Sequence, residues 1–423
     1  MLTRIEALNY RSLQFISERI SPFQTLVGPN GSGKSTFLDV VGYLGDLLRV
    51  GPYKSIVGDG NGVPQRAADL SHLTWMRQGT RFELAVEVAV PESRLVKFES
   101  KYTEARYEVA IESRGESKEV AIAAEILWLK PPDIELPQHP PTLFPDGNRP
   151  PDTLIHEGKS PKGWRKVVNK IADSGNDYFM SETTEWNNSF RLGINKSALA
   201  NLPEDEERFP VATWVKRFLI EGVRKVVLNA QAMRRPSPPG SPLFFVPDGS
   251  NLPWVVHALQ QDHPQNFDRW IAHFQTAIPD LKMISTITRP EDNHRYLVIE
   301  YQNGLKAPSW VVSDGTLRLL ALSLLAYIPG AEGIYLIEEP ENGIHPRAVE
   351  TVFQSLSTVY GAQVLCASHS PVILSLAKPV DLLCFAKTKA GATDIVRGDL
   401  HPRLVNWKGA LDLGTLFAAG VLG

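Results

Sequence analysis

A stretch near the N-terminus has the residue types and spacing of a phosphate-binding loop. It reads Gly28-Pro29-Asn30-Gly31-Ser32-Gly33-Lys34-Ser35-Thr36 and satisfies G-x-x-x-x-G-K-[ST] in full. Glycines let the backbone turn tightly and aim N–H groups inward at a helix N-terminus, where phosphate is the natural ligand. The lysine supplies charge for the β- and γ-phosphates, and the hydroxyl after it is a Mg²⁺ ligand. The candidate nucleotide-binding residues are Asn30, Gly31, Ser32, Gly33, Lys34, Ser35 and Thr36, and Ser35 is also a candidate metal ligand.

The residues around this loop supply the context that it needs. Residues 23–27 are typical of a short buried strand, and Phe37, Val41, Leu44 and Leu48 recur on one face of a helix. The alternative, a chance glycine-rich turn before a helix, is less favoured because such turns usually lack the flanking strand and helix.

A second set of candidate residues follows an apolar run at residues 333–337. Glu338 and Glu339 stand at the end of this predicted strand, where carboxylates are costly to bury without a cation or a polarised water. In phosphate-loop enzymes, an acidic residue at this place helps to hold Mg²⁺ and a neighbouring group orients the attacking water. We assign Glu338 to the metal and Glu339 to the water. The alternative is a solvated acidic turn.

Two further motifs lie on either side of these carboxylates. Ser313-Asp314-Gly315-Thr316 begins an apolar helix, which is either an ordinary N-cap or a second anion-binding helix start. His369 follows another apolar strand at residues 362–367. A lone histidine after a strand is often structural, but at this place it can reach a γ-phosphate, and we treat it as catalytic.

Composition limits the other possibilities. The chain has 423 residues, 43% hydrophobic and 22% charged, as expected of a globular protein with two or three subdomains. No secretion signal or membrane-length apolar run is present, which predicts a cytoplasmic protein without membrane contact. Cys366 and Cys384 are read as core residues. The net charge of −3 means that binding of DNA would need a local basic patch. The densest group of basic residues is Lys216, Arg217, Arg224, Lys225, Arg234 and Arg235, and most of these side chains are expected to be solvated.

The pattern of elements predicts an α/β protein. Two strands between residues 3 and 17 are expected at the edge of the nucleotide-binding sheet, and alternation over residues 81–129 predicts an antiparallel sheet. Residues 130–210 show no sustained periodicity and are read as an irregular insertion. The later elements are predicted as a helix at 211–223, a strand at 225–228, helices at 252–261 and 265–278, and strands at 282–287 and 295–301.

Together, the four motifs resemble those of the ABC-type ATPases of the SMC, RecF and OLD kind, in particular compact AAA-family ATPases. They correspond in order to a Walker A loop, a signature-like motif at Ser313, a Walker B motif at Glu338 with its continuation to Pro346, and a switch histidine at His369. The resemblance implies a P-loop NTPase with an ABC-type head, a mixed central sheet, an antiparallel β subdomain and a helical signature subdomain. The implied domains are residues 1–129 (N-terminal part of the head), 130–223 (insertion), 224–400 (C-terminal part of the head) and 401–423 (apolar tail).

The resemblance also implies cofactors and partners, namely ATP, Mg²⁺ and a second copy of the chain. In such a head-to-tail homodimer, Ser313 and Gly315 of one copy contact the γ-phosphate held by Lys34 of the other. Gln231 is the candidate for the Q-loop residue. Glu338 stands where aspartate is common, and Ser-Asp-Gly replaces the Ser-Gly-Gly of transporters, which argues against a transporter subunit.

Two features narrow the expected role. No sustained heptad pattern occurs between the phosphate loop and residue 312, so the arms of an SMC protein are not expected. Too little chain follows His369 for the Toprim domain of an OLD nuclease, and the apolar tail either packs on the head or binds a partner.

Two functions remain open at this point. One is an ATPase that controls a separately encoded effector, such as a nuclease, in bacterial defence against phage or foreign DNA. The other is a RecF-like, ATP-gated DNA-binding clamp in DNA repair.

Overall fold

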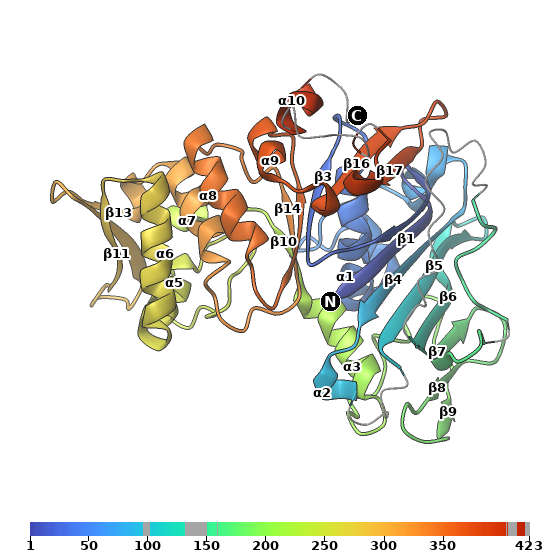
Figure 1. Ribbon diagram of the computed structural model, residues 1–423. Coiled ribbons are helices and arrows are strands. Elements are labelled where there is room, and N and C mark those ends of the chain that lie inside the picture. Colours follow the sequence, from blue (N-terminus) through green and yellow to red (C-terminus); the bar gives the residue numbers. More distant parts are fainter. Residues whose placement is uncertain (96–101, 132–149, 159, 403, 405–412, 419–423) are drawn as a thin grey trace. The chain divides into compact units, whose positions relative to one another are not determined.

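The computed structural model describes residues 1–95, 102–131, 150–158, 160–402, 404 and 413–418 (Figure 1). The chain forms two compact units. Unit 1 comprises Met1–Ser21, Gly28–Val223 and Cys384–Val405. Unit 2 comprises Pro22–Val27, Arg224–Leu383 and Asn406–Gly423.

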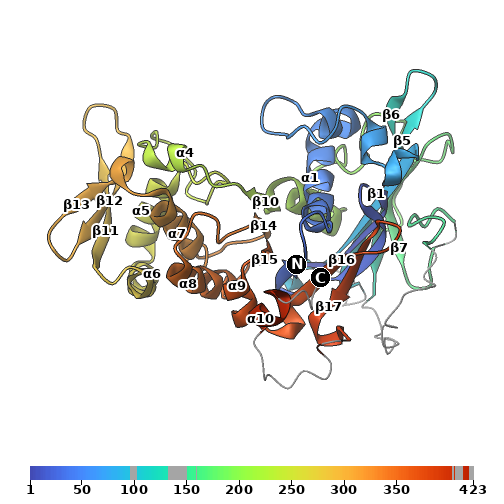
Figure 2. The ribbon, with the colours of Figure 1, turned by 90° about the horizontal axis from the view of Figure 1, so that it is seen from above.

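Unit 1 is built on an eight-stranded antiparallel sheet in the order β2-β1-β4-β5-β6-β7-β8-β9. Figure 2 shows β1, β5, β6 and β7 of this sheet beside α1. The strands are β1 (Leu2–Tyr10), β2 (Leu13–Arg19), β4 (Arg81–Ala89), β5 (Glu104–Arg114), β6 (Glu119–Lys130), β7 (Arg165–Ile171), β8 (Tyr178–Met180) and β9 (Asn187–Ser189). The helices are α1 (Lys34–Val57), α2 (Glu92–Leu95) and α3 (Pro210–Arg217). Strand β16 (Leu382–Lys387) enters unit 1 at Cys384, and β17 (Thr393–Arg397) follows it.

The alternation in β4 gives the sheet two different faces. Phe82, Leu84, Val86 and Val88 are buried, and the ring of Phe82 packs edge-on against Tyr43 of α1, at 5.4 Å between ring centroids. The residues between them point to the opposite face, which carries charge. The apolar face of the sheet therefore packs on the phosphate-loop helix.

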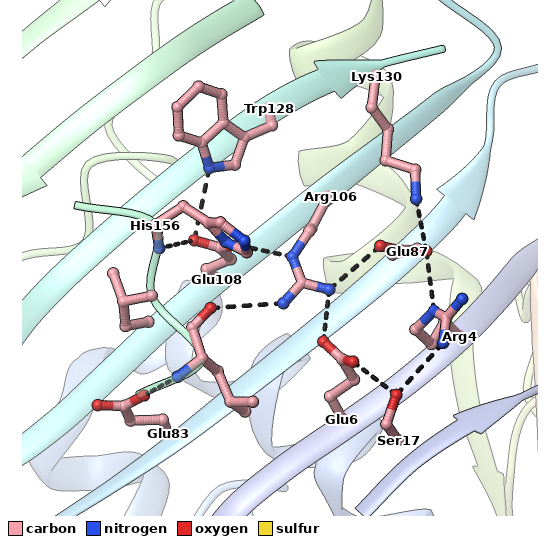
Figure 3. A network of polar contacts seen from close by, with 12 residues as sticks. Arg4, Glu6, Ser17, Glu83, Glu87, Arg106, Glu108, Trp128, Lys130 and His156 are labelled. Carbon is pink, nitrogen blue, oxygen red and sulfur yellow. Dashed lines mark hydrogen bonds and ion pairs between the residues drawn. The ribbon is translucent and has the colours of Figure 1, made fainter. Parts of the chain in front are cut away.

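The opposite face holds a buried network of charges centred on Arg106 (Figure 3). Its guanidinium contacts Glu6, lies 3.1 Å from Oε1 of Glu87 and donates from Nε to Oε1 of Glu108 at 2.5 Å. Lys130 adds an ion pair of 2.8 Å to Glu87. Burial raises the pKa of Glu87, but the hydrogen bond from Lys130 and the charge of Arg106 outweigh it and hold the pKa below its usual value.

A segment at residues 150–158 crosses this charged face. The backbone N–H of Leu154 donates to Glu83 at 2.6 Å, and that of His156 donates to Glu108 at 2.9 Å. The carbonyl of Leu154 accepts from Arg106 at 3.4 Å, and the His156 ring contacts Glu108 at 2.5 Å. The segment thus covers the charges and satisfies part of their hydrogen bonding (Figure 3).

The prediction that the two N-terminal strands edge the nucleotide-binding sheet is wrong. β1 pairs with β2 on one side and with β4 on the other, so both strands belong to the antiparallel sheet of unit 1. β3 (Phe23–Val27) instead pairs in parallel with β15 (Gln363–Ala367) in unit 2. The pattern of a strand does not reveal which partner it has, since pairing is decided by packing far along the chain.

The structure also differs from the prediction of an irregular insertion over residues 130–210. β7, β8 and β9 extend the sheet beyond β6. Their alternation is hidden because Asn169 and Lys170 are buried among the apolar residues of β7, and Lys170 Nζ donates to the carbonyls of Gly193 and Lys196. The helix expected at 211–223 is shorter than predicted, since α3 ends at Arg217 and a π-helical turn follows.

Unit 2 contains two further sheets. Four strands stand in the order β10-β14-β15-β3, and β11-β12-β13 form an antiparallel sheet. The strands are β10 (Val223–Val226), β11 (Leu281–Thr288), β12 (Arg295–Tyr301), β13 (Lys306–Pro308), β14 (Ile334–Glu338), β15 and β3. The helices are α4 (Ala230–Arg234), α5 (Leu252–Asp262), α6 (Pro264–Ala277), α7 (Asp314–Leu324), α8 (Pro346–Ser357), α9 (Pro371–Leu376) and α10 (Leu413–Ala418).

Several local predictions hold in unit 2. The helices at α5 and α6 and the strands β11 and β12 lie where the sequence patterns place them. The predicted strand at 225–228 is displaced: β10 ends at Val226, and Val227 is 61% exposed. The strand ends earlier than predicted because β10 lies at the edge of its sheet, where β14 pairs with it on one side and no strand of the described residues continues the sheet on the other.

The C-terminal tail is partly described. Residues 405–412 and 419–423, which include Trp407, Leu411 and Val421, lie outside the described residues. α10 packs against α9, as Figure 1 shows, and Leu413 is buried. The helix α1 is interrupted at Gly51, whose φ is 81°. In the described ranges, no helix has the length and apolarity needed to cross a membrane.

Candidate functional site

The phosphate loop begins at Gly28, directly after β3, and ends where α1 begins. Gly28, Gly31 and Gly33 all have positive φ, at 148°, 72° and 107°. A Cβ at Gly28 would lie 2.2 Å from the carbonyl oxygen of Phe385, and one at Gly33 would lie 2.2 Å from Oγ1 of Thr393. Positions 28 and 33 therefore accept glycine alone without a shift of their neighbours.

Lys34 is buried at the start of α1 and folds back along the loop. Its Nζ donates to the carbonyls of Gly28 at 2.8 Å and Pro29 at 2.9 Å. Asn30, Gly31 and Ser35 are exposed around it. A cationic side chain beside a helix start and a row of backbone N–H groups fits a phosphate chain, and the exposed Ser35 hydroxyl fits a role as Mg²⁺ ligand.

A pocket of about 560 Å³ adjoins the loop in unit 1 and is lined by basic and aromatic side chains. Ser12, in its wall, would lie 3.0 Å from a Cβ at Gly33, so the pocket and the loop share a boundary. The lining residues are Arg11, Ser12, Arg66, Ala67, His72, Thr74, Trp75, Met76, Arg77 and Gly391.

The acidic pair stands at the end of β14 in unit 2. Glu338 is the last residue of the strand and pairs in register with Ala367 of β15. Glu339 has φ of 49°, in the left-handed region, and its N–H donates to the carbonyl of Ala367 at 2.8 Å. Its carboxylate accepts from the side chain of Asn342 at 2.5 Å. Such backbone strain in a residue other than glycine costs about 1–3 kcal/mol and concentrates at functional sites.

Glu338 forms an ion pair that sequence patterns did not predict. Lys225 Nζ, on β10, lies 2.8 Å from Oε1 of Glu338, whose side chain is 30% exposed. The two residues line a pocket of about 280 Å³ together with Glu339 and Arg318. Carboxylate oxygens suit a divalent cation, and the ion pair with an exposed lysine is one that such a cation would displace.

The loop that carries His369 is held by another carboxylate, Glu341. Its Oε1 accepts from the hydroxyl of Ser368 at 2.8 Å and from the N–H of His369 at 3.0 Å. Its Oε2 is buried without a hydrogen bond to the described residues. Glu341 belongs to the motif after Glu339, but no role was predicted for it, because its hydrogen bonds join the loop after β14 to the loop after β15.

The signature-like motif forms the start of α7. The Ser313 hydroxyl accepts from the N–H of Thr316 at 3.2 Å, so the serine is an N-cap, and it is exposed. Asp314 pairs with Arg234 at 2.5 Å. A Cβ at Gly315 would lie 2.4 Å from the carbonyl oxygen of Gly343, which explains the glycine. The cap interpretation is therefore correct, and phosphate contact by Ser313 stays a prediction.

The Q-loop candidate Gln231 is an exposed residue of the short helix α4. The residue from this region that reaches the acidic pair is Lys225, through the ion pair with Glu338.

Most of the basic residues considered for DNA are engaged by acidic partners or carbonyls. Arg224 donates to the carbonyl of Glu332 at 2.7 Å. The ion pairs of the others are Lys216–Glu204, Arg217–Glu206, Lys225–Glu338 and Arg234–Asp314.

The predicted residues therefore fall into two groups, one in each unit. Residues Asn30 to Thr36 lie together in unit 1. In unit 2, β14, β15 and β3 run in parallel, so the acidic pair, the His369 loop and the end of β3 at Val27 lie at the same edge. The N–H of Ser368 donates to the carbonyl of Leu26 at 3.0 Å.

The family described as "AAA domain, putative AbiEii toxin, Type IV TA system" matches residues 24–375. The chain belongs to this family. The matched range contains the phosphate loop, the signature-like motif, the acidic pair and His369. No curated protein matches the chain.

Solved structures of SMC head domains are similar in fold. One is an SMC head bound to the C-terminal winged-helix domain of ScpA, with a TM-score of 0.52 and 13% identity, covering 93% of this chain and 97% of that one. Another is the head domain with an extended coiled coil from Pyrococcus furiosus, bound to the C-terminal domain of ScpA, with a TM-score of 0.49 and 11% identity, covering 93% and 95%. The first similarity supports the fold of a P-loop NTPase of the ABC type. The fold of this AAA-family chain is therefore similar to that of an SMC head, and its family implies nucleotide binding.

Proposed function

We propose that the protein is a Mg²⁺-dependent ATPase that closes head to tail with a second copy on binding ATP and reopens after hydrolysis. The phosphate loop carries this proposal, since two of its glycines have no room for a side chain and Lys34 is buried against its carbonyls. A ligand that binds the closed dimer alone shifts the equilibrium toward that dimer.

Each candidate residue has a role in this reaction. Lys34 and the loop N–H groups bind the phosphates, and Ser35 and Glu338 would hold Mg²⁺, which neutralises charge on the β- and γ-phosphates. Glu339 accepts the proton of the water that attacks the γ-phosphorus, as the bond to the bridging oxygen breaks and ADP leaves. His369 stabilises the γ-phosphate. Ser313 and Gly315 come from the second copy, and Gln231 is the Q-loop candidate.

We further propose that this cycle controls a separately encoded effector, such as a nuclease, in bacterial defence. The description of the family, which names a putative toxin of a toxin–antitoxin system, supports a role of this kind. The DNA-clamp alternative has less support, because most of the basic residues that would bind phosphates already have partners within the chain.

Two variants test the ATPase proposal. Glu339→Gln keeps the side-chain shape and loses the base, so it should bind ATP, remain dimeric and turn over about 100-fold or more slowly. Lys34→Ala should lose nucleotide binding. The measurements are light scattering with and without Mg²⁺-ATP and phosphate release. A Glu339→Gln protein that stays monomeric with ATP and hydrolyses it normally would refute the assignment.

Co-purification with the product of a neighbouring gene tests the effector. An ATP-dependent complex with a nuclease or toxin supports control of an effector. Salt-sensitive binding of DNA by the protein alone, in a gel shift at low salt, would favour the clamp instead.

A further inference from the structure

A hairpin far along the chain lies against the phosphate loop within unit 1. It consists of the end of β16 and β17, joined by a turn at residues 388–392. The carbonyl oxygen of Phe385 lies against Gly28, and Oγ1 of Thr393 lies against Gly33. The hairpin therefore contacts both ends of the loop.

The position of this hairpin is fixed by packing and hydrogen bonds. The Phe385 ring packs edge-on against Phe37 of α1, with 5.5 Å between ring centroids. Thr393 donates from its N–H to the carbonyl of Ser12 and from Oγ1 to the Ser12 hydroxyl, both at 2.9 Å. Within the turn, the N–H of Thr388 donates to the carbonyl of Ala392 at 2.8 Å. Lys387, between these anchors, has a defined backbone position.

Lys387 places a second ammonium group beside the loop. Its Nζ lies 3.5 Å from the point where a Cβ at Gly31 would be, and Gly31 is exposed with positive φ. Lys387 is exposed, and its side chain makes no hydrogen bond or ion pair with any residue that the structure describes. Lys34, by contrast, is buried and bonded to the carbonyls of Gly28 and Pro29.

We propose that Lys387 is a second cation of the nucleotide site and binds the polyphosphate chain on the Gly31 side of the loop. This inference rests on the proposed function. Lys387 lies outside the G-x-x-x-x-G-K-[ST] motif and reaches the loop through the fold alone. Its long side chain spans several ångströms, and a charge-assisted hydrogen bond to a phosphate oxygen orders it there. Binding of di- and triphosphates gains from this contact, whereas a nucleoside gains nothing.

The chain supplies a matched control in the same turn. Lys389 is two residues further on, carries the same charge and is also exposed. Lys387→Met and Lys389→Met remove the same charge from the same hairpin. A general loss of positive potential affects both variants equally, and a specific contact affects the first alone.

The experiment is a titration with N-methylanthraniloyl derivatives of ATP, ADP and adenosine, followed by fluorescence anisotropy. Lys387→Met should weaken binding of the ATP and ADP derivatives about tenfold, and Lys389→Met should change it less than twofold. Inorganic pyrophosphate should compete less effectively in Lys387→Met. Thermal melting of the variants shows whether both remain folded.

Three outcomes would overturn the inference: equal losses in the two variants, no loss in Lys387→Met, or an equal loss for the adenosine derivative. Lys34→Ala separates this inference from the proposed function. If the wild type binds ATP and Lys34→Ala does not, the proposed site stands whatever Lys387→Met shows. If the wild type binds no nucleotide, the proposed function itself fails.

Discussion

Two sets of glutamates in this protein share similar apolar strand contexts but have opposite environments. Glu87 and Glu108, on the sheet of unit 1, are 4% and 0% exposed and share Arg106 as a partner. Glu338 and Glu339, at the end of β14 in unit 2, are half-buried and exposed respectively, and Glu338 has a surface lysine as its ion-pair partner. Buried carboxylates surrounded by cations hold the structure together, whereas accessible strand-end carboxylates remain able to bind a ligand.

The largest effect is expected at the centre of the buried set. Arg106→Met removes the central cation between the buried Glu87 and Glu108 and the half-buried Glu6, so the free energy of unfolding should fall by about 3–5 kcal/mol. Urea denaturation measures the change. Arg114→Met is the control, because Arg114 pairs with the exposed Asp173 and should change stability by about 0–1 kcal/mol. If Arg106→Met and Arg114→Met lowered the free energy of unfolding equally, the buried glutamates would not depend on their cation more than exposed ones do.

A smaller, pH-dependent effect is expected at Glu182, a buried carboxylate in unit 1. Burial raises its pKa to about 7, although the N–H groups of Val211 and Ala212 donate to it and lower the pKa in part. Between the unfolded value of 4.5 and about 7, the folded state binds more protons, so stability falls as pH rises. The stabilisation by the protonated carboxyl group is therefore complete below pH 4.5. It decreases as pH rises to about 7, and above that pH the titration of Glu182 no longer changes the stability.

Glu182→Gln should remove this slope, which is at most about 1.4 kcal/mol per pH unit. Urea denaturation between pH 5 and 8 compares the variant with the wild type. Glu185→Gln is the control, since the side chain of Glu185 is almost fully exposed. A pH slope in Glu182→Gln as steep as that of the wild type would contradict the raised pKa.

The smallest effect on stability is expected at the accessible set. Lys225→Met breaks an exposed ion pair and should change the free energy of unfolding by less than about 1 kcal/mol. It should still raise the affinity for Mn²⁺, a spectroscopic substitute for Mg²⁺, severalfold in the presence of ATP, because Glu338 loses its competing cation. Electron paramagnetic resonance measures free Mn²⁺. Unchanged or weaker Mn²⁺ binding would show that Lys225 does not compete with the metal.

The sequence predicts the local parts of the candidate site well. The strand before Gly28, the helix after it and the strands before Glu338 and His369 all form as their patterns indicate. The chemistry of these motifs depends on neighbours in the chain, so short-range spacing is sufficient to find them.

The parts that were not predicted depend on partners far along the chain. Glu83, Glu87 and Glu108 alternate with apolar residues as a solvated strand face would, and yet they are buried, because Arg106 and the segment at 150–158 cover them. Lys225 and Lys387 also carry no signal in a local window. The fold alone brings them to Glu338 and Gly31.

The close approach of Gly315 and Gly343 has a mechanical consequence for unit 2. There is no room for a side chain between them, so the start of α7 packs directly on the backbone of the loop after Glu339. Glu341, in the same loop, fastens Ser368 and His369 to it by hydrogen bonds. We therefore expect a displacement of His369 to be transmitted through Glu341 to the start of α7, which carries Ser313.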